Sequence, residues 1–415
     1  MATALLTDRY ELTMLDAALQ SGLAGRRAVF EVFARRLPAG RRFGVLAGPG
    51  RLHALLQDFS FGPVELAALA DVVSPATRDW LDGRQLSLEI TSYAEGETFF
   101  PGSPVLTVEG CFGEALLLET LVLSVLNHDS AVASAAARMV LAAAGRPLIE
   151  MGGRRTHEEA AVAAARAAYL AGFASTSNLE AGRRHGIPTA GTSAHAFTLA
   201  AADEAAAFRA QVAAQGPGTT LLVDTYDAQQ GIRTAVEVGG TGLGAVRLDS
   251  GDLIEETRRA RRLLDQLGAT ATRVVVTGDL DEHAIAALAA TPADGYGVGT
   301  SVVTGSGAPT VGFVYKLVAI AASEDPGAPL HPVAKTSPGK ATVGGRKWAA
   351  RLPDGEQLRL TPDGFPAGAR LLQAPLAAED LDAARARCAA SLAELPPDAR
   401  RLARGEPCWT AELLP

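Results

Sequence analysis

The sequence predicts an α/β protein: an irregular β/α barrel of about seven units, joined to an α+β open-sandwich domain. Between residues 147 and 300, short apolar runs alternate with helical segments at intervals of about 25 residues. Residues 1–110 instead show apolar alternation with period two, typical of antiparallel strands. The strand-helix rhythm stops after Pro309. We therefore expect a barrel domain over 111–310 and a second domain built from 1–110 with 311–415.

The first segment predicts one helix and three strands. Apolar residues recur with helical spacing over 7–19 and then alternate at 29–33 and 86–90. Pro101, Gly102 and Pro104 interrupt the pattern before an apolar run at 105–108. Residues 115–144 are rich in alanine and leucine and predict a long helical region.

Seven apolar runs in the middle of the chain predict strands. They are Leu148-Ile149, Gly172-Phe173, Ile187-Pro188, Leu221-Leu222-Val223, Ala245-Val246, Val274-Val275-Val276 and Tyr296-Gly297-Val298. Thr156, with Glu159 three residues later, has the form of a capping box at a helix start. Alternating strands and helices favour parallel pairing with right-handed crossovers. A closed or partly closed barrel accommodates seven units better than one open sheet does.

The tail has a different pattern. Residues 312–318 predict a strand, 335–352 a glycine-bearing hairpin and 377–395 a helix. We expect this tail to return to the domain of the first segment.

Composition excludes several classes of protein. The net charge is -8 and no basic run is present, which argues against a primary role on nucleic acid or an anionic membrane. The three cysteines are widely spaced and form no CxxC, so neither a disulfide framework nor a structural zinc is expected. No secretory signal and no apolar run of 18 residues is recognisable, so we expect a cytoplasmic protein.

Polar clusters follow the predicted strands directly. They are Arg154-Arg155, Ser175 to Asn178, Gly191 to His195, Asp224 to Asp227, Arg247 to Asp252, Thr277 to Asp279 and Gly297 to Thr300. Any single cluster is equally typical of turns and helix caps. In a β/α barrel, however, the loops after the strands share one rim, where active sites are built. We therefore expect these clusters to converge.

The residue types on this rim favour a phosphorylated sugar associated with Mg²⁺. Arginines and glycine-rich turns bind phosphate or carboxylate groups. Asp249 and Asp252 are candidates to hold ribose hydroxyls or Mg²⁺. His195 is the strongest candidate for chemistry, since imidazole acts as a base or as a nucleophile toward phosphoryl groups; a structural histidine is the alternative. No Walker-type sequence is present, so any use of ATP would not follow the P-loop pattern.

Taken in order, the motifs resemble those of the nicotinate phosphoribosyltransferase family. The resemblance is carried by Thr7-Asp8-Arg9-Tyr10-Glu11-Leu12-Thr13-Met14, Phe33-Ala34-Arg35-Arg36-Leu37-Pro38, Leu118-Glu119-Thr120, Leu126-Asn127 and the barrel clusters above, with Gly278-Asp279-Leu280-Asp281-Glu282. Each motif is weak by itself, but the ordered series over most of the chain is specific.

The resemblance implies a reaction and a fold. The enzyme would transfer phosphoribose from 5-phosphoribosyl 1-diphosphate to nicotinate, forming nicotinate mononucleotide and pyrophosphate in the salvage route of NAD biosynthesis. Its fold would be that of the type II phosphoribosyltransferases. ATP would be a co-substrate, hydrolysed through phosphorylation of His195, and Mg²⁺ a cofactor. A homodimer with shared active sites is implied, Tyr10 stacking on the pyridine ring from the neighbouring subunit.

The resemblance also assigns residues to roles. The catalytic set would be His195, Asp249 and Arg247, and the nicotinate contacts would be Tyr10, Ser177, Thr192 and Arg247. Contacts to phosphoribosyl diphosphate or phosphate would come from Arg35, Arg154, Asp252, Gly278, Asp279, Gly299, Thr300, Lys316 and Lys340. Lys316 and Lys340 belong to the chain's four lysines, which all fall in one stretch, 316–347; a solvated hairpin is the alternative for that cluster.

Ser177 bears on whether the enzyme would accept nicotinate, which is an acid, or nicotinamide, which is the corresponding amide. In related nicotinamide-using enzymes an aspartate stands at the matching position, where it would repel the nicotinate carboxylate, whereas serine can donate to it. Met151 departs from the family pattern, which often has an aromatic residue before the paired arginines. Two other functions remain open: a quinolinate phosphoribosyltransferase, and an inactive barrel that senses phosphoribosyl diphosphate or nucleotides.

Overall fold

The computed structural model describes residues 2–414 and divides into two compact units. Among the described residues, unit 1 contains 2–131, 310–399 and 403–414, and unit 2 contains 132–309 and 400–402. The units place residues 111–131 with unit 1, whereas the sequence favoured a boundary near residue 110. Unit 1 contains segments from both ends of the described chain.

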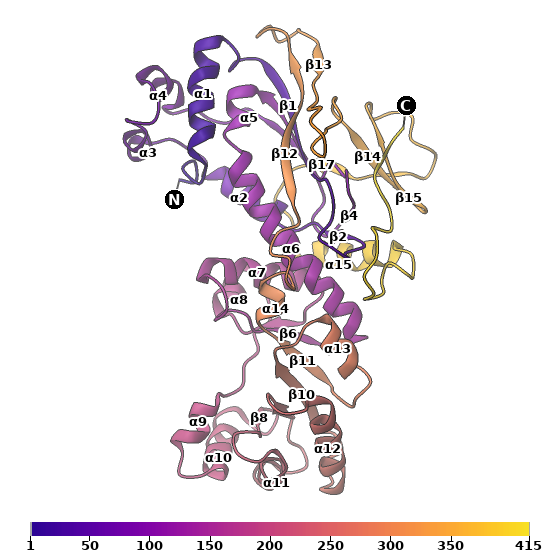
Figure 1. Cartoon of the computed structure of the whole chain (residues 1–415). Coiled ribbons are helices and arrows are strands. Elements are labelled where there is room, and N and C mark those ends of the chain that lie inside the picture. The colour runs from indigo at the N-terminus through magenta and orange to yellow at the C-terminus, as the bar shows by residue number, and fades with distance from the viewer. Residues whose placement is uncertain (1, 415) are drawn as a thin grey trace. The chain divides into compact units, whose positions relative to one another are not determined.

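A six-stranded antiparallel sheet forms the centre of unit 1. Its order is β13-β12-β1-β5-β3-β17, and β1 (Arg27–Ala34) lies between β12 (Phe313–Ala321) and β5 (Leu106–Cys111). The remaining strands are β3 (Glu89–Tyr93), β13 (Leu330–Pro332) and β17 (Gln373–Pro375), with β2 (Gly44–Val45) pairing with β4 (Thr98–Phe99) beside them. Figure 1 shows β1 and β12 side by side, so segments almost 300 residues apart in sequence share one sheet.

Apolar side chains of this sheet and of its helices form the core of unit 1. The helices are α1 (Arg9–Ser21), α2 (Pro49–Gln57), α3 (Pro63–Ala68), α4 (Pro75–Leu81), α5 (Phe112–Leu116) and α15 (Leu381–Glu394). On the central strands, the rings of Phe30 and Tyr315 stack with their centroids 4.8 Å apart. The helical region predicted over 115–144 is divided, because α6 (Glu119–Ala143) begins only after a break at Leu117-Leu118.

Two sequence expectations for unit 1 were wrong in detail. Leu86 and Leu88 lie outside β3, because the backbone N–H of Ser87 donates to the Glu114 carboxylate instead of a neighbouring strand. The predicted hairpin over 335–352 lies later in the chain. β14 (Trp348–Leu352) pairs with β15 (Gly355–Arg359) across a turn at Pro353-Asp354, and β16 (Arg370–Leu371) and β18 (Glu412–Leu413) complete this small sheet.

Unit 2 is built on a six-stranded parallel sheet. Its order is β7-β6-β11-β10-β9-β8, and every pair of neighbours is parallel. The strands are β6 (Leu148–Glu150), β7 (Ser175–Thr176), β8 (Thr220–Leu222), β9 (Ala245–Leu248), β10 (Arg273–Gly278) and β11 (Gly295–Val298). Ile187-Pro188, predicted as a strand, is followed by Thr189, which forms only an isolated bridge to Thr176.

Helices connect these parallel strands. They are α7 (Glu158–Leu170), α8 (Leu179–His185), α9 (His195–Ala200), α10 (Glu204–Gln215), α11 (Ala228–Gly239), α12 (Leu253–Gln266), α13 (Glu282–Leu288) and α14 (Thr300–Val303). Figure 1 shows α10, α11 and α12 gathered beside the β8 to β10 part of the sheet. The predicted capping box is wrong, because His157, not Thr156, is the N-cap residue of α7, and its side chain makes no capping hydrogen bond.

In the described part of the chain, no helix is both long and apolar enough to cross a membrane.

A buried ion pair joins the central strand of unit 1 to the tail. The Lys347 ammonium lies 2.7 Å from Glu31 Oε2, and the backbone N–H of Lys347 donates to Glu31 Oε1, also at 2.7 Å. Both residues are buried. Removing one partner of such a pair is costly because the other charge stays buried without compensation.

Lys347→Met is therefore expected to lower the free energy of unfolding of unit 1 by about 3–5 kcal/mol. Urea unfolding followed by tryptophan fluorescence measures this, since Trp80, Trp348 and Trp409 all lie in unit 1. The double variant Glu31→Leu/Lys347→Met should recover most of the loss. Arg9, which is exposed on α1 of the same unit, provides the control, and a Lys347→Met loss no larger than that of Arg9→Met would contradict the prediction.

Candidate active site

The carboxyl ends of four neighbouring strands in unit 2 surround one cavity of about 270 Å³. Met151 follows β6, Asp249 follows β9, Asp279 follows β10 and Gly299 follows β11. The complete lining is Met151, Arg154, Arg155, Arg247, Asp249, Thr277, Gly278, Asp279, Gly297, Gly299 and Thr300. We call this space the strand-end cavity. Four of the seven polar clusters that were expected to converge therefore meet at this cavity.

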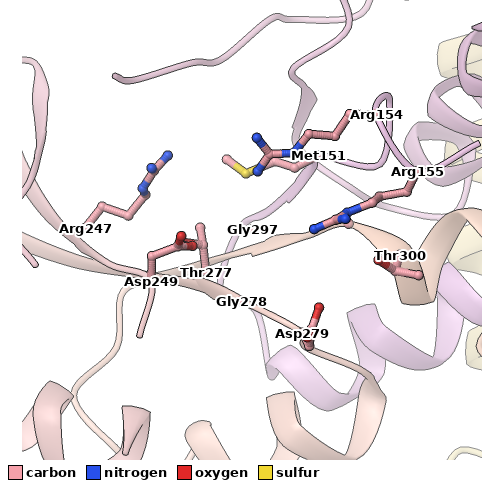
Figure 2. Close-up of a pocket in the computed structure, with 11 residues that line it drawn as sticks. Met151, Arg154, Arg155, Arg247, Asp249, Thr277, Gly278, Asp279, Gly297 and Thr300 are labelled. Carbon is pink, nitrogen blue, oxygen red and sulfur yellow. The ribbon is translucent and has the colours of Figure 1, made fainter. Parts of the chain in front are cut away.

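The strand-end cavity is lined by three arginines and two aspartates, a formal charge of +1. Figure 2 shows the guanidinium groups of Arg154 and Arg247 extending toward each other, with the carboxylates of Asp249 and Asp279 below them. Guanidinium groups bind phosphate and carboxylate oxygens in bidentate geometry. The cavity is therefore suited to a polyanion that carries a sugar or a cation.

Two glycines keep the floor of this cavity open. A Cβ on Gly297 would lie 2.6 Å from Thr277 Cγ2 and 2.7 Å from Met151 Sδ, closer than side-chain atoms approach. Gly278 has φ 142°, in the region that residues with a side chain rarely adopt. A larger residue at position 297 would displace the cavity walls, whereas one at position 278 would strain the backbone.

Arg247 is held in place by the loop that precedes His195. Its Nη1 donates to Thr192 Oγ1 at 2.7 Å and its Nη2 to the Ser193 carbonyl at 3.1 Å, whereas Nε is buried and has no partner among the described residues. Burial lowers the pKa of Arg247 below its ordinary value, and the nearby carboxylates of Asp249 and Asp224 oppose that shift. The guanidinium stays charged at neutral pH because arginine starts from so high a pKa.

Asp249 is fixed from two sides. Thr277 Oγ1 donates to its carboxylate, and its backbone N–H donates to Asp224 Oδ2 at 2.7 Å. Asp224 also accepts from Ser250 Oγ at 2.8 Å. Asp224 was not among the predicted site residues, although the run that begins with it follows a predicted strand and had been noted as a cluster.

His195 begins α9 beside Asp249. Its Nδ1 lies 3.1 Å from Thr225 Oγ1 and its Nε2 lies 3.8 Å from Asp249 Oδ2. The imidazole side chain is 40% exposed, so it is open to a ligand. His195 itself does not line the strand-end cavity, but its carboxylate neighbour does.

A second cavity of about 530 Å³ shares Met151, Arg154 and Arg247 with the first. Its other lining residues are Gly153, Ser177, Asn178, Leu179, Gly191 and Thr192. We call it the side cavity. Three of the predicted nicotinate-contacting residues, Ser177, Thr192 and Arg247, therefore meet at one place.

Glu150 holds the backbone beside both cavities, and it was not among the predicted site residues. Its carboxylate accepts from the backbone N–H of Gly152 and from Thr176 Oγ1, while its carbonyl accepts from the backbone N–H of Ser177 at 2.8 Å. Burial raises the pKa of Glu150 although both side-chain contacts act to lower it. A lone glutamate at a strand end gives no sequence signal for such a role.

Several residues that were predicted to contact substrate lie outside the strand-end cavity and the side cavity. Asp252 caps α12, accepting from the backbone N–H groups of Ile254 and Glu255, and lines neither cavity. Arg35 lines a separate cavity of about 450 Å³ in unit 1, and Lys340 is exposed in the turn before β14. Tyr10, on α1, and Lys316, on β12, also belong to unit 1.

The donors in the strand-end cavity fit Mg²⁺ that is shared with substrate. Among residues 2–414, no group of three or more histidine, cysteine or acidic side chains is placed to hold a metal ion. The cavity does present two carboxylates, Asp249 and Asp279. Mg²⁺ is commonly held by one or two carboxylates together with substrate phosphates and water.

Known proteins resemble this chain closely. A model of the nicotinate phosphoribosyltransferase N-terminal domain matches residues 5–127. A nicotinate phosphoribosyltransferase of Mycobacterium tuberculosis (strain H37Rv) is 54% identical over 99% of this chain and 95% of its own length. The human nicotinate phosphoribosyltransferase is 31% identical over 85% of this chain and 77% of its own length.

The fold agrees as well. The crystal structure of human nicotinic acid phosphoribosyltransferase matches with a TM-score of 0.83 and 26% identity, covering 98% of this chain and 97% of that one. The family predicted from the ordered motifs is therefore confirmed by sequence comparison along nearly the whole chain. This chain belongs to the nicotinate phosphoribosyltransferase family.

Proposed function

We propose that this protein transfers phosphoribose from 5-phosphoribosyl 1-diphosphate to nicotinate, giving nicotinate mononucleotide and pyrophosphate for NAD salvage. One observation carries the proposal: a cationic cavity with an ordered carboxylate adjoins a second cavity lined by Ser177 and Thr192, and Arg247 belongs to both. The first suits the diphosphate and ribose, and the second suits a small ring that bears a carboxylate. The names of the relatives agree with this pairing.

Charge development in the reaction matches the strand-end cavity. As the bond from the anomeric carbon to diphosphate breaks, positive charge develops on the ribose and negative charge on the leaving group. Asp249, held by Thr277 and Asp224, would stabilise the sugar, while Arg154 and Arg155 would stabilise the diphosphate. Asp249 and Asp279 would hold Mg²⁺, which would add positive charge at the leaving group.

The side cavity would hold nicotinate by its carboxylate. Arg247 and the hydroxyls of Ser177 and Thr192 are suitable donors, and the ring nitrogen would face the anomeric carbon. That nitrogen already has a lone pair, so it forms the new bond without a general base. Met151 lines both cavities and would contact the ring where relatives often have an aromatic residue.

Pyrophosphate release tests the proposal against its alternatives. Purified protein would be supplied with 5-phosphoribosyl 1-diphosphate, Mg²⁺ and either nicotinate, nicotinamide or quinolinate, each with and without ATP. We expect release with nicotinate and stimulation by ATP. Preferential release with quinolinate, independent of ATP, would identify a quinolinate phosphoribosyltransferase, and binding without release would identify a sensor.

We further propose that ATP phosphorylates His195. A neutral imidazole nitrogen would attack the γ-phosphorus, the bond from that phosphorus to its bridging oxygen would break, and ADP would leave. Thr225 Oγ1 orients the ring through Nδ1, and the exposed imidazole lies beside Asp249, where a phosphoryl group would add negative charge next to the substrate site.

His195→Ala should abolish a protein-bound phosphate that is stable in base and labile in acid. The measurement is retention of label from γ-labelled ATP after denaturation at alkaline and acidic pH. His331→Ala is the matched control, because His331 is exposed on β13 of unit 1. Labelling that persists in His195→Ala would assign the phosphate to another residue.

Ser177→Asp should reduce kcat/KM for nicotinate on the order of 100-fold and reduce the value for nicotinamide much less, because the new carboxylate would repel only the acid. Steady-state kinetics with both substrates measures the ratio. Ser177→Ala removes the donor without adding charge and should cost less. Equal losses for the two substrates in Ser177→Asp would remove Ser177 from substrate discrimination.

The remaining expectations stay predictions. A homodimer is supported by exposed apolar residues near the N-terminus, namely Leu5, Leu6, Tyr10 and Met14. We infer that Tyr10 enters the side cavity of the partner subunit. We also infer that the parallel sheet, with the Thr189 bridge, forms the wall of an irregular barrel of about seven units, and that unit 1 is an α+β open sandwich. A cytoplasmic location also remains a prediction, as do phosphate contacts by Arg35 and Lys340.

A further inference from the structure

Asn178 lines the side cavity with a side-chain amide whose orientation is fixed. Its Oδ1 accepts from the backbone N–H of Ala181 at 2.9 Å. Only the amide oxygen can make this contact, because the amide nitrogen carries two hydrogens and is a donor. The Nδ2 group therefore remains available to donate, and it has no hydrogen-bond partner among residues 2–414.

The backbone of Asn178 is held as firmly as its side-chain oxygen. Its N–H donates to Thr176 Oγ1 at 3.0 Å, and the Thr176 hydroxyl in turn donates to Glu150 Oε2 at 2.6 Å. Thr176 and Glu150 are both buried. The amide is thus ordered before any ligand binds, which reduces the conformational entropy lost on binding.

The Nδ2 group lies beside open space within the side cavity. A Cβ on Gly153, which also lines this cavity, would lie 3.7 Å from Asn178 Nδ2. Apart from the residues next to Gly153 in the chain, that Cβ would meet no other atom of the described residues within 4 Å. A ligand in the side cavity can therefore reach the free donor.

Donors predominate among the polar side chains of the side cavity. Arg154 and Arg247 carry guanidinium groups, and no aspartate or glutamate of the described chain lines this space. The Thr192 hydroxyl already accepts from Arg247 and donates to the Ser193 carbonyl, at 2.7 and 3.3 Å. A carboxylate only accepts hydrogen bonds, whereas a carboxamide brings two N–H groups that need acceptors. The cavity therefore suits an acid better than the corresponding amide.

We propose that Asn178 is a specificity-determining residue, which donates from Nδ2 to the carboxylate of nicotinate and so favours nicotinate over nicotinamide. The inference rests on the proposed function, which places nicotinate in the side cavity. Asn178 would act beside Ser177, but the two side chains differ. A serine hydroxyl rotates to donate or to accept, whereas the amide of Asn178 can only donate while its oxygen is bound to Ala181.

Asn178→Asp exchanges this one donor for an acceptor and keeps the contact to Ala181, because aspartate caps a helix as well as asparagine does. It should lower kcat/KM for nicotinate on the order of 100-fold or more, since a hydrogen bond to a charged group is lost and a negative charge is added beside the carboxylate. The value for nicotinamide should fall by less than about threefold, because the new oxygen can accept from its amide. Equal losses for both substrates would overturn the proposal.

Asn178→Ser removes the donor without adding charge, and serine still supplies a capping oxygen. It should lower kcat/KM for nicotinate about tenfold. Asp203→Asn is the matched control, because Asp203 Oδ1 caps α10 by accepting from the backbone N–H of Ala206 at 2.6 Å and lines neither cavity of unit 2. This control should leave the ratio of nicotinate to nicotinamide kcat/KM unchanged. The same unchanged ratio in Asn178→Ser would overturn the proposal.

Equilibrium binding tests the contact without relying on catalysis. Isothermal titration calorimetry would measure nicotinate and nicotinamide binding to wild-type protein and to Asn178→Asp, with pyrophosphate and Mg²⁺ present and folding verified by circular dichroism. The Kd for nicotinate should rise on the order of 100-fold in the variant, and the Kd for nicotinamide should change little. An unchanged nicotinate Kd would overturn the inference. Wild-type protein that binds nicotinate selectively yet releases no pyrophosphate from 5-phosphoribosyl 1-diphosphate would instead overturn the proposed function and leave the Asn178 contact supported.

Discussion

Parallel pairing of β6, β11, β10 and β9 determines which side chains of this protein meet. In the register of these strands, Gly297 lies opposite both Ile149 and Thr277, and Leu248 lies opposite Val276. The residues that follow each strand are therefore brought to one edge, although they are 20 or more positions apart in sequence. Antiparallel pairing would have sent alternate loops to opposite edges.

Charged side chains gather at this edge of the sheet, and the contacts around them reduce the free-energy cost of burying their charges. Arg247 is largely removed from water, yet Thr192 and Ser193 satisfy two of its nitrogens, and the carboxylates of Asp249 and Asp224 lie near. Asp224 holds the backbone of Asp249 and the side chain of Ser250. Such an arrangement keeps the donors in place before an anion arrives, which is how an ordered site stabilises developing charge.

The sequence predicted site residues best where a residue type has a single structural role at the end of a strand. Glycines and hydroxyls at the ends of apolar runs led to the prediction that Gly278, Gly299 and Thr300 contact substrate, and all three line the strand-end cavity, because the apolar pattern fixes the strand ends. Asp252 carried a similar pattern but caps α12, and capping is a local interaction that competes for the same residue types. A position directly after a strand therefore does not show whether a residue lines the site or caps a helix.

Other features depended on contacts between distant residues. Glu150 hydrogen-bonds to Thr176 on β7 and Asp224 to Asp249 directly after β9, so no short motif reveals either residue. Lys316, which was predicted to contact phosphate, lies 3.5 Å from Glu119, a contact between distant residues that no motif reveals. The tail hairpin was misplaced because the predicted range, 335–352, ends with β14, whereas Pro353-Asp354 makes the turn between β14 and β15.

The central claim is that the two adjoining cavities of unit 2 bind and join the two substrates, and Arg247 belongs to both. The most direct measurement is the initial rate of nicotinate mononucleotide formation by Arg247→Met and by wild-type protein, with unchanged folding verified by circular dichroism. The account predicts a fall in kcat/KM on the order of 100-fold or more, because a buried donor to both substrates is lost. An Arg247→Met enzyme with the wild-type rate would contradict it.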